Sequence, residues 1–318
     1  MITFLRRKAL GLGSVRGLTS YMNSSNDTSV SGILTQGSEA SILRNDKLQT
    51  VRGRDLVSST QMLIRWGCTT ETGVPTGAQL NTSRAIKQVN NKAQFRNLLQ
   101  LQGDQLVPLS VVSTCTTTSS SSSLNTTDAS LVLRTSRHAQ GKNLWVVNGL
   151  EGALEVVNSR PALFQEGWYA SELIDKVAEY RVYVVSGKVA TVAEKTPADR
   201  SQVAWNVAQG GRFDVVNWGD WNMEVVRVAI EAFNLSELDF GGVDVMVDQE
   251  GKAYVIEINS APSLPLLSDG SISYRQKCMA KSFMYIRDHG KDRLPVENYD
   301  GWRSVIHPAI RMEEYNHA

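Results

Sequence analysis

Two carboxylates and a side-chain amide lie close together in residues 239–264, DFGGVDVMVDQEGKAYVIEINSAPSL. The alternation in this stretch predicts two strands joined by a turn at Asp248–Gly251. Glu257 and Asn259 are two residues apart on the second strand and therefore share a face, and Asp244 on the first strand can face them. Two carboxylates and an amide oxygen form the hard-oxygen donor set that Mg²⁺ prefers, usually completed by water and substrate phosphates. The pattern indicates a site for a divalent cation.

The alternative explanation is a solvated hairpin with ordinary surface carboxylates. Glu257 and Asn259, however, interrupt the apolar run AYVIEIN, where bulk solvation is unfavourable. Buried without a cation, two carboxylates would repel each other. The metal site is therefore the favoured interpretation.

A basic loop upstream holds a second set of residues with ligand chemistry. Residues 134–142, RTSRHAQGK, follow the strand-like Leu131–Leu133 and precede LWVV at 144–147. In such a hairpin, backbone amides and cationic side chains can surround a polyphosphate. A solvated loop explains the same residues equally well, because basic hairpin loops are common.

The segments that must position these residues mix strand and helix patterns, which are typical of an α/β protein. The expected strands are Met62–Trp66, 106–112, Leu131–Leu133, 144–147, Ala162–Trp168 and the hairpin Glu179–Val185 with Lys188–Glu194. The expected helices are Asn81–Leu101, broken at Asn90–Asn91, then Asn222–Asn234 and Arg275–Asp288. A chain of 318 residues is long enough for two lobes.

Composition excludes several classes of function. The net charge is +1 without a strong basic or acidic block, so no nucleic-acid or membrane surface is expected. No apolar run approaches the ~20 residues that span a bilayer. The three cysteines are widely spaced and lack metal-ligand spacing, which fits a reducing cytoplasm and a packing role.

Two segments carry little pattern. Residues 1–26 have no acidic residue and no apolar core long enough for a secretory signal, which favours a mobile basic start over an organelle transit peptide. Ser113–Ser130 is polar and of low complexity, and we expect a mobile surface connection there.

Taken in order, these segments resemble the ATP-grasp superfamily of ATP-dependent carboxylate–amine ligases. Within it they are most similar to amino-acid and peptide ligases such as D-alanine–D-alanine ligase and the ribosomal-protein glutamate ligase. The resemblance covers roughly residues 81–267, and its most specific part is GVDVMVDQEGKAYVIEINSAPSL. It implies an ATP-grasp fold, in which two α+β lobes clasp ATP, with a short N-terminal α/β region.

The resemblance also implies roles for single residues. Asp244, Glu257 and Asn259 would hold Mg²⁺, with Mn²⁺ as an alternative, against the ATP phosphates, and Arg181 would stabilise an acyl phosphate as the catalytic residue. Gln165–Trp168 match the hinge that holds adenine. The implied ATP-binding residues are Lys92, Arg134, His138, Gly141, Lys142, Gln165, Glu166, Gly167, Trp168, Lys195 and Asn206.

Some residues depart from the family pattern. Arg134 stands where the family has Lys, and its forked guanidinium requires a different phosphate geometry. The loop 136–141 has a single Gly, and Ser263 replaces the usual Gly after Pro262. Without the resemblance, Lys92 would be taken as a solvated lysine on a helix. Three tryptophans could line a substrate pocket or fill the core, namely Trp205, Trp218 and Trp221.

We expect residues 1–104 to form the N-terminal region, 105–170 the small lobe, 171–290 the large lobe and 291–318 a C-terminal tail. The implied activity joins a carboxylate and an amine, either small molecules or peptides, at the expense of ATP through an acyl phosphate. Self-association into a homo-oligomer stays open. The alternative is a nucleotide-binding or structural protein that has lost catalysis. The intact Asp244, Glu257 and Asn259 favour activity, whereas Arg134 and the single-Gly loop leave room for the alternative.

Overall fold

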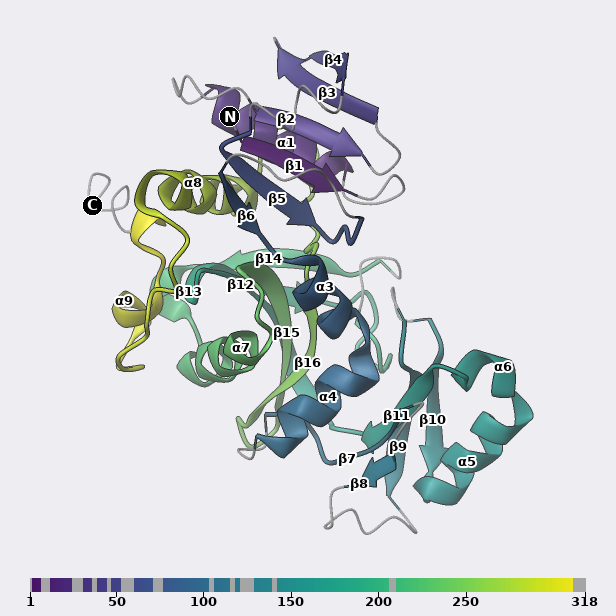
Figure 1. The fold of residues 1–318 in the computed structure, drawn as a ribbon. Coiled ribbons are helices and arrows are strands. Elements are labelled where there is room, and N and C mark those ends of the chain that lie inside the picture. The colour runs from purple at the N-terminus through teal and green to yellow at the C-terminus, as the bar shows by residue number, and fades with distance from the viewer. Residues whose placement is uncertain are drawn as a thin grey trace.

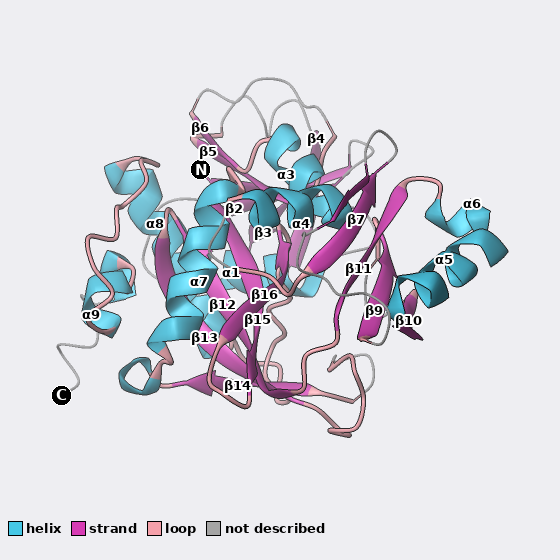
Figure 2. Ribbon diagram, turned by 90° about the horizontal axis from the view of Figure 1, so that it is seen from below, coloured by secondary structure: helices cyan, strands magenta, loops and turns pink. Residues whose placement is uncertain are grey.

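The computed structural model describes residues 2–6, 12–24, 31–35, 39–44, 47–52, 60–70, 77–102, 106–114, 118–120, 129–138, 142–205 and 210–310. These residues build three sheets. In Figure 1 the sheet of residues 2–80 is at the top, the sheet of residues 176–259 is in the middle, and the sheet of residues 110–172 is at the lower right. Helices pack beside each sheet (Figure 2). The mixture of helix and sheet confirms the predicted α/β class.

The N-terminal sheet has six strands in the order β4-β3-β2-β1-β5-β6. Its strands are β1 (Ile2–Arg6), β2 (Ser31–Thr35), β3 (Glu39–Arg44), β4 (Lys47–Arg52), β5 (Met62–Trp66) and β6 (Ala78–Leu80). The central strand β1 is parallel to both β2 and β5, and all five of its residues are buried.

The prediction of a mobile basic start is wrong for 2–6 and 12–24. Helix α1 (Leu12–Ser24) buries Val15, Leu18 and Met22, which recur at helical spacing. It packs against α8 (Tyr274–His289), a helix from the far end of the chain. Since both partners of β1 lie well downstream, short-range pattern could not indicate the sheet.

The second sheet has the order β10-β9-β11-β7-β8 and forms the small lobe. Its elements are β7 (Ser110–Thr114), β8 (Thr118–Ser120), β9 (Ser130–Thr135), β10 (Leu144–Asn148), α5 (Gly149–Ser159), α6 (Pro161–Phe164) and β11 (Gly167–Glu172). The hairpin of β9 and β10 around the basic loop is confirmed. The strand expected at Ala162–Trp168 is wrong for residues 162–166, because Pro161 begins a helical turn and β11 starts only at Gly167. Strand β8 lies inside the expected connection Ser113–Ser130, most of which is outside the described residues.

The third sheet is entirely antiparallel, with the order β14-β13-β12-β15-β16, and forms the large lobe. Its elements are β12 (Lys176–Val185), β13 (Lys188–Thr196), β14 (Arg212–Val216), the 3₁₀ turn η2 (Trp218–Asp220), α7 (Met223–Leu235), β15 (Phe240–Asp248), β16 (Ala253–Asn259) and the short α9 (Trp302–Val305). The two predicted hairpins and the predicted helices at α7 and α8 are confirmed.

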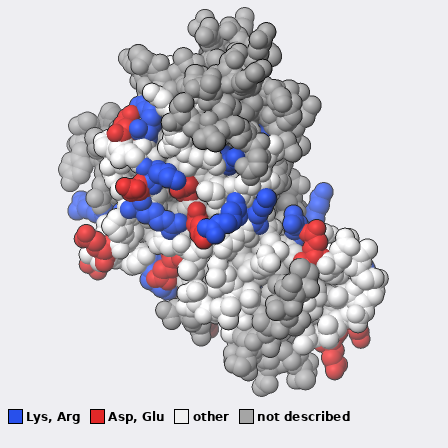
Figure 3. All heavy atoms as spheres, viewed as in Figure 1, with Lys and Arg blue, Asp and Glu red and all other residues white. Residues whose placement is uncertain are grey.

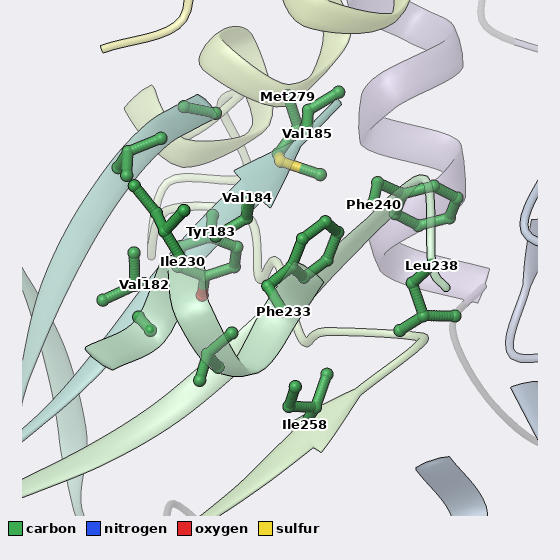
Figure 4. Close-up of a cluster of buried hydrophobic side chains, with 14 of the residues drawn as sticks. Val182, Tyr183, Val184, Val185, Ile230, Phe233, Leu238, Phe240, Ile258 and Met279 are labelled. Atoms are coloured by element: carbon green, nitrogen blue, oxygen red, sulfur yellow. The ribbon is translucent and has the colours of Figure 1, made fainter. Parts of the chain in front are cut away.

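The core of the large lobe lies between this sheet and α7 (Figure 4). Asn222 caps α7 by accepting from the backbone N–H groups of Glu224 and Val225. The apolar stripe of the helix, including Ile230 and Phe233, is then buried on the sheet. This packing leaves the opposite face of the sheet for polar side chains.

Two helices, α3 (Ser83–Asn90) and α4 (Lys92–Leu101), lead from the N-terminal sheet to the small lobe. The predicted break between them is confirmed: Thr82 caps α3 and Asn91 caps α4. Beside them, the Val255 N–H of β16 donates to the Leu106 carbonyl at 2.6 Å, which ties the two lobes together. Within the described residues, no helix is both long enough and apolar enough to cross a membrane.

Candidate functional site

The hairpin of β15 and β16 brings the three predicted metal ligands to one face. Asp244 pairs directly with Glu257, and Gly242 pairs with Asn259. The register shifts between Asp244 and Val245, so Ile256 is an extra residue on β16. Such a bulge bends the strand and redirects its side chains. The Asn259 amide donates to the Glu257 carboxylate at 3.0 Å, which fixes the two side chains relative to each other.

Arg181 of β12 is the direct cross-strand partner of Asp244 on the neighbouring strand β15. Its Nε and Nη2 donate to the two Asp244 oxygens at 2.5 and 2.7 Å. Burial alone would lower the pKa of Arg181, but the paired carboxylate raises it above the ordinary value. Both side chains are buried, so this fork is a well-ordered, charge-assisted contact.

A further carboxylate, Glu179, holds the lysines on this face. Lys195 Nζ lies 3.0 Å from Glu179 Oε1 and 3.8 Å from Asp244 Oδ2, and Lys176 Nζ lies 3.3 Å from Glu179 Oε2. Burial lowers the pKa of Lys176. Sequence reasoning missed Glu179, although its position two residues before Arg181 on the same strand predicts that both side chains share a face.

Cations from the small-lobe side meet the other carboxylate. Lys92 Nζ donates to the Ile258 carbonyl at 2.6 Å and lies 3.8 Å from Glu257 Oε2. Arg134 Nη2 donates to His138 Nδ1 at 2.7 Å, and His138 Nδ1 lies 4.0 Å from the same Glu257 oxygen. The basic loop therefore packs against the hairpin of β15 and β16 through Arg134 and His138.

The charge states of this group follow from their surroundings. Burial, reinforced by Arg134, lowers the pKa of His138 to about 3, so the ring is neutral at pH 7. With Nδ1 accepting from Arg134, the Nε2–H is assigned as the donor to Tyr169 Oη at 3.0 Å. Burial alone would raise the pKa of Glu257, but Lys92 and Arg134 hold it below the usual range. The Glu257 carboxylate is therefore ionised at pH 7.

Arg96 is a second residue that sequence reasoning missed. Its Nη2 donates to the Ile256 carbonyl at 3.0 Å, at the bulge, and its guanidinium lies 4.7 Å from the centre of the Tyr169 ring. Burial lowers its pKa. Arg96 is one helical turn after Lys92 on α4, so i,i+4 spacing was the available signal.

Other predicted ATP-binding residues are not brought to this cluster. Lys142 is exposed, and Gln165 and Glu166 are exposed where β11 begins, with Glu166 paired to Arg137. Gly167 and Trp168 are buried in β11. Gly141 and Asn206 are outside the described residues.

The connection between the two lobes is at residues 173–175 and not at Gln165–Trp168. Strand β11 ends at Glu172 in the small-lobe sheet, and β12 starts at Lys176 in the large-lobe sheet. Gln165–Trp168 therefore precede the connection between the lobes, and their role in holding adenine stays a prediction.

None of the three tryptophans has a described contact with Asp244, Glu257 or Asn259. Trp205 is buried beneath Lys176, whose Nζ is 4.7 Å from its ring. The ring centres of Trp218 and Trp302 are 3.8 Å apart with the rings tilted by 48°. Trp218 and Trp221 also line a hollow of about 190 Å³. None of the predicted site residues lines this hollow.

The donor set fits a hard divalent cation that also contacts phosphate. Within the described part of the chain, no cluster of three or more His, Cys, Asp and Glu side chains has the arrangement of a metal site. The candidate set here is smaller, since it has two carboxylates and one amide. It leaves coordination positions for phosphate oxygens and water, as Mg²⁺ prefers. Asp244, Glu257 and Asn259 are the residues that would hold it.

Two lobes with a carboxylate–amide hairpin between cationic side chains define the ATP-grasp class of protein. The RimK-like ATP-grasp domain matches residues 89–278, which is more than half of the chain. The protein therefore belongs to the RimK-like ATP-grasp family. A sequence search found no similar protein among curated ones.

Several solved structures of ATP-grasp ligases have the same fold. D-alanine–D-alanine ligase from Bacillus anthracis, complexed with ATP, is 12% identical with a TM-score of 0.57, covering 90% of this chain and 98% of that one. The ATP-grasp ligase PsnB, complexed with a minimal precursor, Mg and ADP, is 13% identical with a TM-score of 0.55, covering 90% and 97%. A Chryseobacterium gregarium RiPP-associated ATP-grasp ligase, with ADP and a leader and core peptide, is 11% identical with a TM-score of 0.55, covering 93% and 100%.

Proposed function

We propose that this protein is an ATP- and Mg²⁺-dependent ligase that joins a carboxylate to an amine. One observation carries the proposal: the metal-type hairpin is flanked by cations from both sides of the lobe junction. Lys92 approaches Glu257 from α4, whereas Arg181 and Lys195 approach Asp244 from β12 and β13. Such a site can neutralise a polyphosphate and an acyl phosphate together.

The reaction that suits this site has two steps. A carboxylate oxygen of the acid substrate attacks the γ-phosphorus of ATP, the bond to the β-phosphate oxygen breaks, and ADP leaves. The amine then attacks the carbonyl carbon of the acyl phosphate, inorganic phosphate leaves, and the nitrogen loses a proton. Phosphorylation is needed because a carboxylate oxygen is a poor leaving group. Catalysis then depends on positioning and charge neutralisation.

The residues of this chain have distinct parts in that chemistry. Lys92 and Arg134 would neutralise the phosphates, because their charges lie on the small-lobe side of Glu257. Arg181 would stabilise the charge that develops on the transferred phosphoryl group, with Lys195 beside it. Bound Mg²⁺ would add further neutralisation of the phosphate charge.

The adenine is proposed to lie near the connection at 173–175, where the lobes meet, while Gln165–Trp168 remain proposed contacts only.

The boundaries near 104, 170 and 290 are retained as proposed domain limits. A cytoplasmic location is proposed on cysteine usage, and Cys68 and Cys278 are buried and free.

The test is ADP release by the purified protein with ATP, Mg²⁺ and pooled amino acids and peptides. Glu257→Gln preserves the shape of the side chain but removes its charge, so metal-dependent turnover should fall at least about 100-fold, in line with the loss of one preorganised electrostatic group. Glu250→Gln, at the exposed turn of the same hairpin, is the matched control and should keep full turnover. Full activity of Glu257→Gln would refute the metal assignment.

A second candidate is a nucleotide-binding protein without turnover. It is favoured by the contact in which Arg181 engages both oxygens of Asp244 and so competes with a cation. A rise in melting temperature with ATP and Mg²⁺, together with no ADP release from any pool, supports this candidate against the ligase.

A further inference from the structure

Arg275 is a buried arginine close to the site, and it has no acidic partner among the described residues. It lies in the first turn of α8 and is only 7% exposed. Its Nη1 donates to the Tyr183 hydroxyl at 3.3 Å, and its guanidinium lies 5.5 Å from the centre of the Phe213 ring. Its Nε is buried and has no acceptor among the described residues. No carboxylate in that part of the chain pairs with it.

Arg275 lies on the same face of the large-lobe sheet as the proposed catalytic residue. Tyr183 follows Arg181 by two residues on β12, so both side chains share that face. Phe213 pairs with Lys195, and its ring also receives the Arg181 guanidinium at 4.7 Å. The Phe213 ring is therefore shared by both arginines.

A comparison of the two arginines shows what Arg275 lacks. Arg181 uses its Nε and Nη2 to hold both oxygens of Asp244. Arg275 engages Tyr183 through Nη1, which leaves its Nε edge directed away from that bond. A buried guanidinium without an anion is unfavourable, whereas a carboxylate can accept two parallel bonds from such an edge.

The position of Arg275 separates it from the proposed phosphate site. Lys92 meets β16, whereas Arg275 contacts β12 and β14, which are two and four strands away in the sheet. At about 4.8 Å per strand, these distances are about 10 and 19 Å. An anion at Arg275 would therefore lie away from Lys92 and beside Arg181, whose guanidinium packs on the same Phe213 ring.

We infer that Arg275 binds a carboxylate of the substrate that is not the group being joined, with Tyr183 and Phe213 holding the guanidinium in place. This inference rests on the proposed function. It specifies the substrate class as an amino acid or peptide that keeps a free carboxylate, bound with that carboxylate on α8 and its reacting group at Arg181.

The test compares Arg275→Gln with Lys277→Gln, a control that removes an exposed cation from the same helix. Melting temperatures are measured with a non-hydrolysable ATP analogue, Mg²⁺ and pooled L-amino acids and dipeptides, and again with the same pools as C-terminal carboxamides. We expect carboxylate pools to stabilise the wild type and Lys277→Gln. In Arg275→Gln, their apparent affinity should fall by about 10- to 100-fold, the usual loss for a charge-assisted contact.

The ligand-free variant supplies a second measurement. Since Arg275 has no ion pair to lose, Arg275→Gln should have a melting temperature equal to or above that of the wild type. A lower melting temperature by several degrees would indicate a structural role and overturn the inference. It is also overturned if carboxylates and carboxamides stabilise the wild type equally, or if Arg275→Gln binds the carboxylates normally.

ADP release separates the two proposals when it is measured in parallel samples that contain ATP in place of the non-hydrolysable analogue. Carboxylate binding that depends on Arg275, without ADP release, refutes the ligase and retains the binding site. ADP release that Arg275→Gln leaves unchanged refutes the binding site and retains the ligase.

Discussion

Removing the charge of Glu179 should destabilise the large lobe more than the loss of an exposed ion pair would. Glu179 is 4% exposed, and it holds two lysines whose side chains are only 11% and 7% exposed. Glu179→Gln preserves the shape but leaves Lys176 and Lys195 without their common partner. Removal of one partner from a buried pair costs about 3–5 kcal/mol.

The lower end of that range is the expected loss, because both lysines keep other contacts. Lys195 Nζ lies 3.8 Å from Asp244, and Lys176 donates to the Val203 carbonyl at 2.8 Å. A loss of about 3 kcal/mol corresponds to a fall in melting temperature of roughly 5–10 °C for a chain of this size. Urea unfolding followed by tryptophan fluorescence measures the free energy.

The matched control is Glu224→Gln, the same change in an exposed ion pair. The side chains of Glu224 and Arg227 are 38% and 32% exposed, so the loss should stay below about 1 kcal/mol. In the double variant Glu179→Gln with Lys195→Met, the total loss should be smaller than the sum of the single losses, by about 1–3 kcal/mol. A Glu179→Gln protein within about 0.5 kcal/mol of the wild type would refute the buried ion-pair network.

Two further substitutions test close packing and pH dependence. In Gly242→Ala the added Cβ would lie 2.9 Å from the Pro262 Cβ and 3.3 Å from the Arg181 Cδ. The free energy of unfolding should therefore fall by about 1–3 kcal/mol, and ADP release should decrease. Gly219→Ala, which has open space around the added Cβ, is the control and should change neither. Burial lowers the pKa of His307 to about 3, so the unfolded chain binds a proton first and the wild type loses stability as pH falls from about 6.5 towards 3. His307→Asn should reduce this loss by up to about 1.4 kcal/mol per pH unit, and urea midpoints at pH 7, 6 and 5 that change in parallel in both proteins would contradict it.

Surface charge gives no reason to change the expected partners. On the face drawn in Figure 3, Lys and Arg side chains alternate with Asp and Glu over the described residues, and no broad single-sign patch is visible there. The expectation that the protein does not bind nucleic acid stays a prediction.

Local pattern was strong enough to predict the elements of the large lobe. The hairpin of β12 and β13 turns at Ser186–Gly187, where both residues have positive φ, and its strands alternate over many residues. Helix α7 carries a continuous apolar stripe after a capping Asn222. In these segments the local preference agrees with the tertiary environment, so short-range reasoning succeeds.

The N-terminal sheet could not be predicted in the same way. Strand β1 is only five residues long, and it is stabilised by parallel pairing with β2 and β5. Parallel partners lie far apart in sequence, so nothing close to Ile2–Arg6 indicates that this segment is buried. The same holds for α1, whose partner helix α8 is more than 200 residues downstream.

The sequence by itself determined the candidate metal ligands, because Asp244, Glu257 and Asn259 belong to one hairpin whose period places them on one face. Only the tertiary structure decided which charged side chains pair with one another. Lys92 reaches the carbonyl of Ile258 from 166 residues away. Only the packed structure shows that Glu179 is shared by two lysines and that Arg275 has no carboxylate partner among the described residues. Burial and pairing depend on the packing of distant segments, and a linear pattern does not contain that information.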